Sequence, residues 1–207
     1  NVEDGGDAQT EWNGCFQGIM QANYVIEDLN KLSPEKFGFS EAEFDNLKAQ
    51  CRVLRAWFYI RLLDAFRNVP LAVSFNDVSQ NTETQVEPRV IFDFIESELL
   101  ETIPMLVEKT SLGSNSTIQG QWTKAAAAAL LVRLYLNAQV YIGEEKYNEC
   151  AAIAQKIVAG EYGKYEIADR WDAAFDWDND NCDEVIFGFP ADAGYTYWQY
   201  QGDTYWW

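Results

Sequence analysis

The chain has 207 residues and carries 33 acidic against 15 basic side chains, a formal net charge of −18 at pH 7. Nucleic acid and anionic membrane surfaces both require a basic face, so this charge argues against either as a partner. Hydrophobic residues make up 48% of the chain, which excludes a disordered tail and allows a sizeable core. The sequence contains no histidine, which removes Ser-His-Asp and Cys-His nucleophile pairs and histidine-ligated zinc.

An apolar stripe at steps of three and four residues predicts a helix from about residue 10 to 32. Ser40, with Glu43 three residues later, forms a capping box that predicts the start of a long helix reaching Phe66. A turn with a proline and a glycine separates the two helices, so residues 10–66 should form an antiparallel hairpin. The two stripes consist of Trp12, Phe16, Ile19, Met20, Asn23, Ile26 and Leu29, and of Phe44, Leu47, Cys51, Leu54, Phe58, Leu62 and Phe66.

The sequence pattern of residues 89–160 predicts a second set of helices. A helix should begin at Pro88 and continue to Leu106, with Ile91, Ile95, Leu99 and Ile103 (or Phe94) turned inward. Thr123 should cap a helix that continues to about Tyr141, and another should occupy residues 144–158. Small residues at steps of three and four favour a tetratricopeptide-like hairpin of these last two helices, although a generic helical hairpin would look similar. The residues in question are Ala128, Leu131, Leu134 and Tyr135, and Tyr147, Ala151, Ala154 and Ile157.

The remaining segments lack a helical period. The stretch VPLAVSF, after the first hairpin, has extended character. Residues 161–207 are rich in aromatic side chains and irregular, with a strand expected at 184–189. The sequence therefore predicts a mainly α fold of tetratricopeptide-like antiparallel helical hairpins with loop-rich, minor β extensions. No apolar run approaches the roughly 18 residues that a membrane span needs.

Several motifs follow one another in the order of a known family. The segment CRVLRAWFYIRLLDAFRNVPL resembles its long helix with an Arg-Ala-aromatic motif and a "G-x-VPL" exit, where the exit glycine is replaced here by Arg67 or Asn68. The segments EPRVIFDFIESELLETIPML, TKAAAAALLVRLYL and EVIFGF resemble later motifs of the same family. The chain is similar in this way to the SusD/RagB outer-membrane nutrient-binding lipoproteins. The matching positions are Trp12, Phe16, Ile19, Asn23, Arg55, Ala56, Trp57, Phe58, Tyr59, Val69, Pro70 and Leu71.

The resemblance implies a non-catalytic, surface-exposed lipoprotein that binds oligosaccharide or polysaccharide and acts as a lid on a SusC-like TonB-dependent transporter. It implies no cofactor and no metal, and contact with the membrane only through a lipid anchor. Members of this family are usually more than twice as long. We therefore expect residues 1–207 to form one incomplete SusD-like helical domain, without the N-terminal lipidation segment and the C-terminal half. The start at Asn1 fits a processed or truncated product.

The strongest candidate site is the aromatic tail. Sugar rings stack their C–H faces on flat aromatic rings, while the polar edges of Tyr and Trp bond hydroxyl groups. Two glycines near these residues indicate a loop, and exposed aromatic patches mark interaction sites. Packing against a C-terminal half is the alternative. The proposed ligand-binding residues are Tyr195, Tyr197, Trp198, Tyr200, Tyr205, Trp206 and Trp207.

Acidic groups give weaker candidates. The run DWDNDNCDE imitates the start of an EF-hand, but Asn181 and Phe187 stand where glycine and glutamate are needed, so a solvated turn is favoured. The pairs Glu96 and Glu98, or Glu144 and Glu145, could suggest glycosidase chemistry, but these residues are expected on helix surfaces. Arg55 and Arg61 are expected to pair with acids. The N-terminal loop, with Asp7 and Glu11, is a second candidate ligand edge.

The cysteines Cys15, Cys51 and Cys150 fall on or beside helical stripes and are interpreted as small buried residues, with one disulfide left open. Three functions remain. The first is glycan capture for an importer, the second a helical-repeat adaptor for peptides or proteins, and the third a glycoside hydrolase. The aromatic tail favours the first over the second, and the missing histidine counts against the third.

Overall fold

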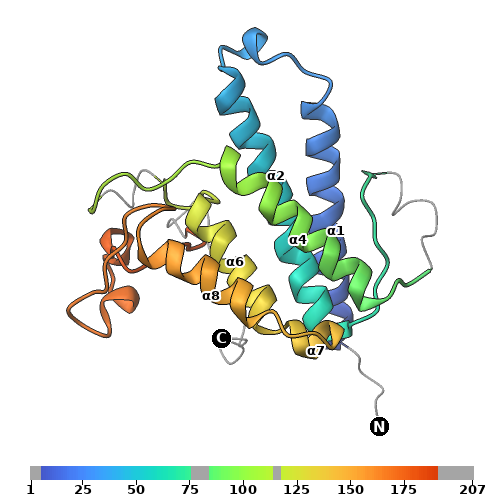
Figure 1. The fold of residues 1–207 in the computed structure, drawn as a ribbon. Helices are drawn as coiled ribbons and strands as arrows, with labels where there is room; N and C mark the ends of the chain where they lie inside the picture. Colours follow the sequence, from blue (N-terminus) through green and yellow to red (C-terminus); the bar gives the residue numbers. More distant parts are fainter. Residues whose placement is uncertain (1–5, 76–83, 114–117, 191–207) are drawn as a thin grey trace.

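The computed structural model describes residues 6–75, 84–113 and 118–190. Helices that follow one another in the sequence pack side by side, and the fold is mainly α, as predicted (Figure 1). The order of packing is α1 (Gly6–Leu29) on α2 (Glu41–Phe66), α2 on α4 (Pro88–Thr102), α4 on α6 (Lys124–Leu136) and α6 on α8 (Tyr147–Val158), with the short α7 (Ala138–Ile142) against α4.

The first hairpin is formed by α1 and α2, the two long helices of Figure 1. The predicted capping box is confirmed at its second helix. The Glu43 backbone N–H donates to the Ser40 hydroxyl (3.3 Å), and the Ser40 N–H donates to the Glu43 carboxylate (2.8 Å). A short 3-10 turn, η1 (Pro34–Phe37), ends at Gly38, whose φ of 75° suits glycine. The first helix begins at Gly6, four residues earlier than predicted.

The buried face of α2 differs from the predicted stripe. Leu47 is exposed and Phe58 is only half-buried. The reason is that α2 packs against α1 on one side and α4 on the other, so burial extends around most of its circumference and no single stripe describes it. The fully buried apolar residues of this helix include Ala49, Val53, Ala56, Tyr59, Ile60, Leu62 and Leu63.

The helix α4 agrees with the sequence prediction. Pro88 is its first residue, a position where the missing N–H costs nothing. The predicted inward residues Ile91, Ile95, Leu99 and Ile103 are all buried. The last of them begins η2 (Ile103–Met105), a 3-10 turn that tightens the end of the helix.

The two following helices match the prediction in part. Thr123 caps α6, since its hydroxyl accepts from the Ala126 N–H (3.2 Å). The helix breaks at Asn137, whose side-chain amide donates to the Arg133 carbonyl (2.9 Å) and competes with the backbone ladder. The final helix begins at Tyr147 rather than residue 144.

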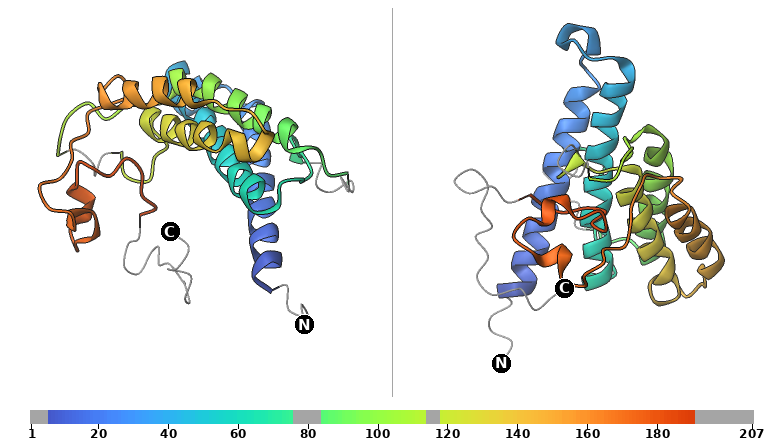
Figure 2. Two further views of the ribbon diagram at one scale, coloured as in Figure 1. Left: turned by 60° about the horizontal axis from the view of Figure 1, so that its bottom comes forward. Right: turned by 90° about the vertical axis from the view of Figure 1, so that its left-hand side faces the viewer.

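The packing of α8 on α6 corrects one detail of the predicted hairpin. Tyr147 and Ala151 are exposed, whereas Cys150 is buried and Ile153 and Ile157 pack against the core. Like α1 at the other end of the row, α8 packs mainly on one neighbouring helix, here α6, so only a narrow strip of its surface is buried. In Figure 2 the helices α4, α6 and α8 lie side by side as one curved layer.

Residues 161–190 leave this layer as an irregular segment, orange to red in Figure 2. The strand predicted at 184–189 is not formed. Extended pairing within the described residues is limited to isolated bridges, Val69 with Val86 and Lys109 with Gly163. Two 3-10 turns, η3 (Ala173–Phe175) and η4 (Asn179–Asn181), shape the segment instead. In the part of the chain that is described, no helix is both long and apolar enough to cross a membrane.

Candidate functional site

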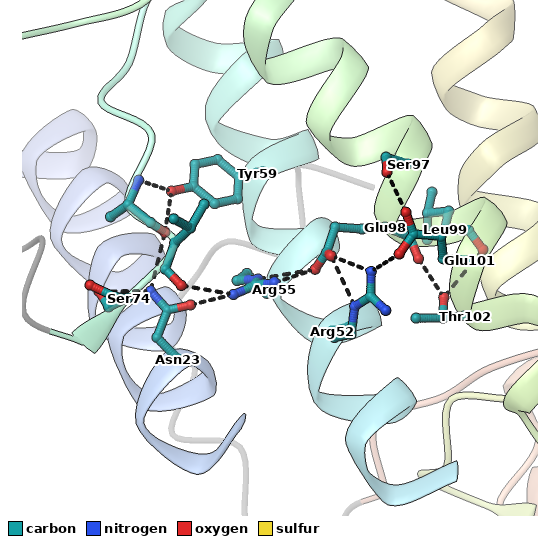
Figure 3. A network of polar contacts seen from close by, with 12 residues as sticks. Asn23, Arg52, Arg55, Tyr59, Ser74, Ser97, Glu98, Leu99, Glu101 and Thr102 are labelled. Carbon is teal, nitrogen blue, oxygen red and sulfur yellow. Dashed lines mark hydrogen bonds and ion pairs between the residues drawn. The ribbon is translucent and has the colours of Figure 1, made fainter. Parts of the chain in front are cut away.

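A buried polar network joins the first three long helices (Figure 3). Arg55 of α2 donates to one carboxylate oxygen of Glu98 on α4 from Nε (3.1 Å) and Nη2 (2.5 Å). Arg52 donates to the other oxygen at 2.9 and 2.7 Å. Glu98 was predicted on a helix surface; this was wrong, because its side of α4 faces α2. The predicted pairing of Arg55 with an acid is confirmed.

The same network holds the chain after α2. Arg55 Nη1 donates to the Asn23 side-chain oxygen (2.6 Å), and the Asn23 amide donates to the Ala72 and Ser74 carbonyls (3.1 and 3.2 Å). The Tyr59 hydroxyl donates to the Ala72 carbonyl and accepts from its N–H. Because every oxygen of Glu98 is engaged by a guanidinium, this carboxylate holds helices together and is not available as a general acid or base.

A groove of about 760 Å³ lies between residues 118–121, just before α6, and residues 174–190. Its lining combines aromatic rings with amide and carboxylate groups. Ligand sites typically combine such apolar walls with a few polar groups that fix orientation. The lining residues are Ile118, Gln119, Gly120, Gln121, Ala174, Trp177, Asn179, Asp180, Val185, Ile186, Phe187, Gly188, Phe189 and Pro190.

Stacked aromatic rings attach one wall of the groove to the helices. Trp122, buried before the first turn of α6, stacks on Phe187 with ring centres 3.9 Å apart and planes at 12°. Phe189 meets the edge of Trp57 on α2 at 5.4 Å and that of Phe187 at 5.0 Å. Contacts of this kind add about 0.5–1.5 kcal/mol each beyond the area that they bury. They keep residues 185–189 against the helical layer even without a strand.

The opposite side of the groove belongs to a segment whose large rings stand in solvent. The exposed fraction is 93% for Trp177, 87% for Trp171 and 80% for Phe175. Arg170 pairs with Asp172 (2.8 Å) and Asp176 (3.3 Å), which links the start of this segment to its middle. Of these three rings only Trp177 lines the groove, and large exposed apolar groups beside a hollow are typical of interaction surfaces.

One buried ion pair joins the groove to the rest of the fold. Lys109, almost fully buried, donates from Nζ to Asp183, and the Gly113 backbone N–H donates to the same carboxylate (2.8 Å). The Lys109 hydrogen bond, opposed by burial and helped by the Gly113 N–H, lowers the pKa of Asp183 below its ordinary value. The backbone of Lys109 is also joined to the segment after α8, since the Lys164 N–H donates to the Lys109 carbonyl (2.8 Å).

The sequence-predicted site residues fall in different places. The aromatic tail lies outside the described residues. The N-terminal candidate edge is a helix from Gly6 onward, and Glu11 is bound by Arg61 (2.6 and 2.8 Å), so the prediction of a loop there was wrong. That contact confirms the predicted pairing of Arg61 with an acid. The hydrogen bond from Arg61 is also the largest cause of the lowered pKa of Glu11. The predicted tail residues that lie outside the described part of the chain are Tyr195, Tyr197, Trp198, Tyr200, Tyr205, Trp206 and Trp207.

Other predicted groups find partners within the fold. Glu96 accepts a hydrogen bond from Lys146 (2.8 Å). The described residues place no group of three or more metal-ligating side chains together, and Cys15, Cys51 and Cys150 are free thiols. Sequence reasoning missed Trp171, Phe175 and Trp177. The signal for them was present, since each of these rings is followed directly by an aspartate and the stretch has no helical or strand period.

Comparison with known proteins places these features in a family. A family model described as "Starch-binding associating with outer membrane" (SusD-like_3) matches residues 1–136. The starch-binding protein SusD of Bacteroides thetaiotaomicron is 28% identical over 201 residues, which are 95% of this chain and 33% of SusD. The chain therefore spans about a third of the length of that relative.

Solved structures agree with the sequence comparison. A laminarin-binding SusD-like protein superposes with a TM-score of 0.66 at 26% identity, covering 80% of this chain and 34% of its own. Surface glycan-binding protein A from Bacteroides fluxus gives a TM-score of 0.66 at 25% identity, covering 86% of this chain and 35% of its own. With a family model matched over residues 1–136 of 207 and this shared fold, the chain belongs to the SusD-like family of outer-membrane-associated proteins.

Proposed function

We propose that this chain is the helical part of a non-catalytic cell-surface protein that captures oligosaccharide or polysaccharide. The observation that carries the proposal is the set of solvent-exposed rings beside the groove, above all Trp177 at 93% exposure. The two sides of a sugar ring present C–H groups, which stack on flat aromatic faces with little loss of hydration. Large apolar rings left in solvent beside a groove are typical of sites that a ligand or partner covers.

Polar groups in the groove supply the second half of sugar recognition. Gln119 and Asp180 line the same hollow as Trp177. An amide both donates and accepts hydrogen bonds, and a carboxylate accepts from two hydroxyls, so together they match the alternating donors and acceptors of a sugar. Because such contacts replace contacts with water, each adds little net free energy, and we expect modest affinity per site.

The aromatic tail belongs to the same proposal. It follows Pro190, the last lining residue of the groove, in the sequence. We propose that rings of the tail extend the sugar-binding surface. The residues concerned are Tyr195, Tyr197, Trp198, Tyr200, Tyr205, Trp206 and Trp207.

Delivery to a transporter completes the proposed function. The family resemblance implies a SusC-like TonB-dependent partner in the outer membrane and a lipid anchor that holds the protein at the cell surface. The family description, association with the outer membrane, supports this location. The named relatives bind starch and laminarin, two uncharged glucans, which makes both the first ligands to test.

The test is titration calorimetry of the full chain with maltooligosaccharides and laminarioligosaccharides. We expect one of them to bind, and Trp177→Ala and Trp198→Ala each to weaken binding by about two- to tenfold, the loss of one stacking contact. Phe175→Ala should also weaken binding. Its matched control is Phe37→Ala, which removes a ring that is 56% exposed at the far end of the first hairpin and should leave binding unchanged. Equal affinities in all variants would contradict the ring-stacking proposal. Release of shorter sugars would indicate a hydrolase, and retention of peptides alone would indicate the adaptor.

A further inference from the structure

We infer that the groove selects uncharged glycans over anionic ones, and that Asp180 is a specificity-determining residue in it. This inference rests on the proposed function and names the ligand class of the same site. The lining residues include Asp180 and contain no lysine or arginine. A sugar carboxylate or sulfate placed in the groove would therefore meet a negative charge and find no cation on the lining to offset it.

Cations close to the lining segments in the sequence are paired with other acids. Lys124, three residues after Gln121, pairs with Glu108 (3.1 Å), and Arg170 pairs with Asp172 and Asp176. Lys109 is buried against Asp183. Asp178 and Glu184, which flank lining residues in the sequence, add further negative charge, and the whole chain carries −18. An anionic ligand thus meets both a local and a general repulsion, which salt should screen.

An uncharged sugar meets no such penalty at the same position. Its hydroxyls donate to the Asp180 carboxylate, and hydrogen bonds to a charged acceptor are stronger than those between neutral groups. Asp180, partly buried on η4, and the exposed Trp177 line the same groove, so a sugar stacked on the indole lies in the same hollow as the carboxylate. One side chain can therefore both favour a neutral ligand and repel an anionic one.

The experiment compares laminarin with sulfated laminarin of matched length, using the full chain at 20 and 500 mM NaCl. We expect the sulfated form to bind at least tenfold more weakly at low salt, and the gap to narrow at high salt because charges are screened. The result that overturns the inference is equal affinity for the two glucans. If neither laminarin binds, neutral and sulfated maltooligosaccharides are compared in the same way. Binding of none of the four glucans overturns the proposed function itself, and the two failures are thereby distinguished.

Variants assign the selectivity to one residue. Asp180→Lys should raise the affinity for sulfated laminarin by tenfold or more, and Asp180→Asn should raise it less. The matched control is Asp178→Lys, an exposed neighbour outside the lining that makes the same change in net charge. We expect the control to change the affinity less than threefold. Equal effects at the two positions would show that the charge of the whole surface, and not Asp180, sets the preference.

Discussion

Arg55 and Glu98 meet between α2 and α4 as a buried ion pair, with both Arg55 contacts directed at a single carboxylate oxygen. The side chains are exposed by only 8% and 7%. Arg52 occupies the second oxygen and also reaches Glu101 (2.6 Å). In the low-dielectric interior such a pair is stable only while each charge keeps its partner, so the network makes the packing of α1, α2 and α4 interdependent.

Removing one partner should therefore cost far more than removing both. We expect Arg55→Met to lower the free energy of unfolding by about 3–5 kcal/mol, because Glu98 stays buried after losing one of its two guanidinium partners and Asn23 loses its donor. The double variant Arg55→Met with Glu98→Leu should recover part of that loss. Urea unfolding followed by circular dichroism measures both. As a control, Arg89→Met breaks the exposed pair with Glu144 and should cost less than about 1 kcal/mol. Equal costs at the two sites would contradict the account.

The helices could be predicted where local chemistry decides them. The caps at Ser40 and Thr123 are set by residues within one turn, and the inward face of α4 follows a single period. The buried face of α2 could not be predicted, because it depends on two neighbours and not on one. The burial of Glu98 likewise depends on Arg55, which is 43 residues away in the sequence.

The site was predictable only in kind. Aromatic rings outside any helical period indicated a sugar-binding surface, and the tail was selected because its rings are dense. The stretch around Trp177 holds fewer aromatic residues than the tail. The exposure of Trp177 depends on the position of η3 and η4 away from the helical layer. The groove itself is created by Trp122 stacking on Phe187, a contact between residues 65 apart that no local pattern announces.

Gly14 and Gly18, both in the interior of α1, should respond oppositely to alanine. A Cβ on Gly18 would lie 2.1 Å from two ring atoms of Phe58, whereas one on Gly14 would meet nothing within 4 Å. We expect Gly14→Ala to raise the free energy of unfolding by up to about 1 kcal/mol through helix propensity. Gly18→Ala should lower it by about 1–3 kcal/mol, because the ring of Phe58 must move away. Chemical denaturation measures both, and stabilisation by Gly18→Ala would show that the two helices can separate at little cost.

Arg67 adopts a backbone conformation that is unusual for any residue other than glycine. Its φ of 64° and ψ of −77°, with the Asn68 N–H donating to the Phe66 carbonyl (2.8 Å), define a strained γ-turn at the end of α2. The guanidinium offsets part of this strain by donating to the Leu63 carbonyl (2.9 Å) and lying over the Tyr141 ring. The sequence resemblance places a glycine of the family at or next to this position.

Two substitutions separate the strain from the contacts. Arg67→Ala and Arg67→Gly lose the same side-chain contacts, but only glycine tolerates the positive φ. We expect Arg67→Gly to be more stable than Arg67→Ala by about 1 kcal/mol in thermal or urea unfolding. At the exposed, helical Arg133 the order should reverse, with alanine the more stable by about the same amount. The same order at both positions would mean that the turn carries no strain.

The ion pair of Lys109 with Asp183 makes the stability of the fold depend on pH. Because the folded-state pKa of Asp183 is lowered below the ordinary 3.8, its contribution is fully present above that value. The contribution is lost as the pH falls through the lower folded-state pKa, where the carboxylate takes up a proton. We expect the difference in unfolding free energy between the native chain and Asp183→Asn to be constant from pH 5 to 7 and to shrink below about pH 4.

The same pair should also affect the groove. Asp183 stands two residues before Val185, where the wall of the groove begins, and Phe187 and Phe189 can reach the helical layer only if that wall stays close. Asp183→Asn keeps the shape of the side chain but weakens the contact with Lys109, so we expect it to reduce glycan affinity at pH 7 as well as stability. Asp178→Asn removes the same charge from an exposed position and should do neither. If the two variants weaken glycan binding equally, the effect comes from net charge, and the Lys109–Asp183 pair does not position the groove.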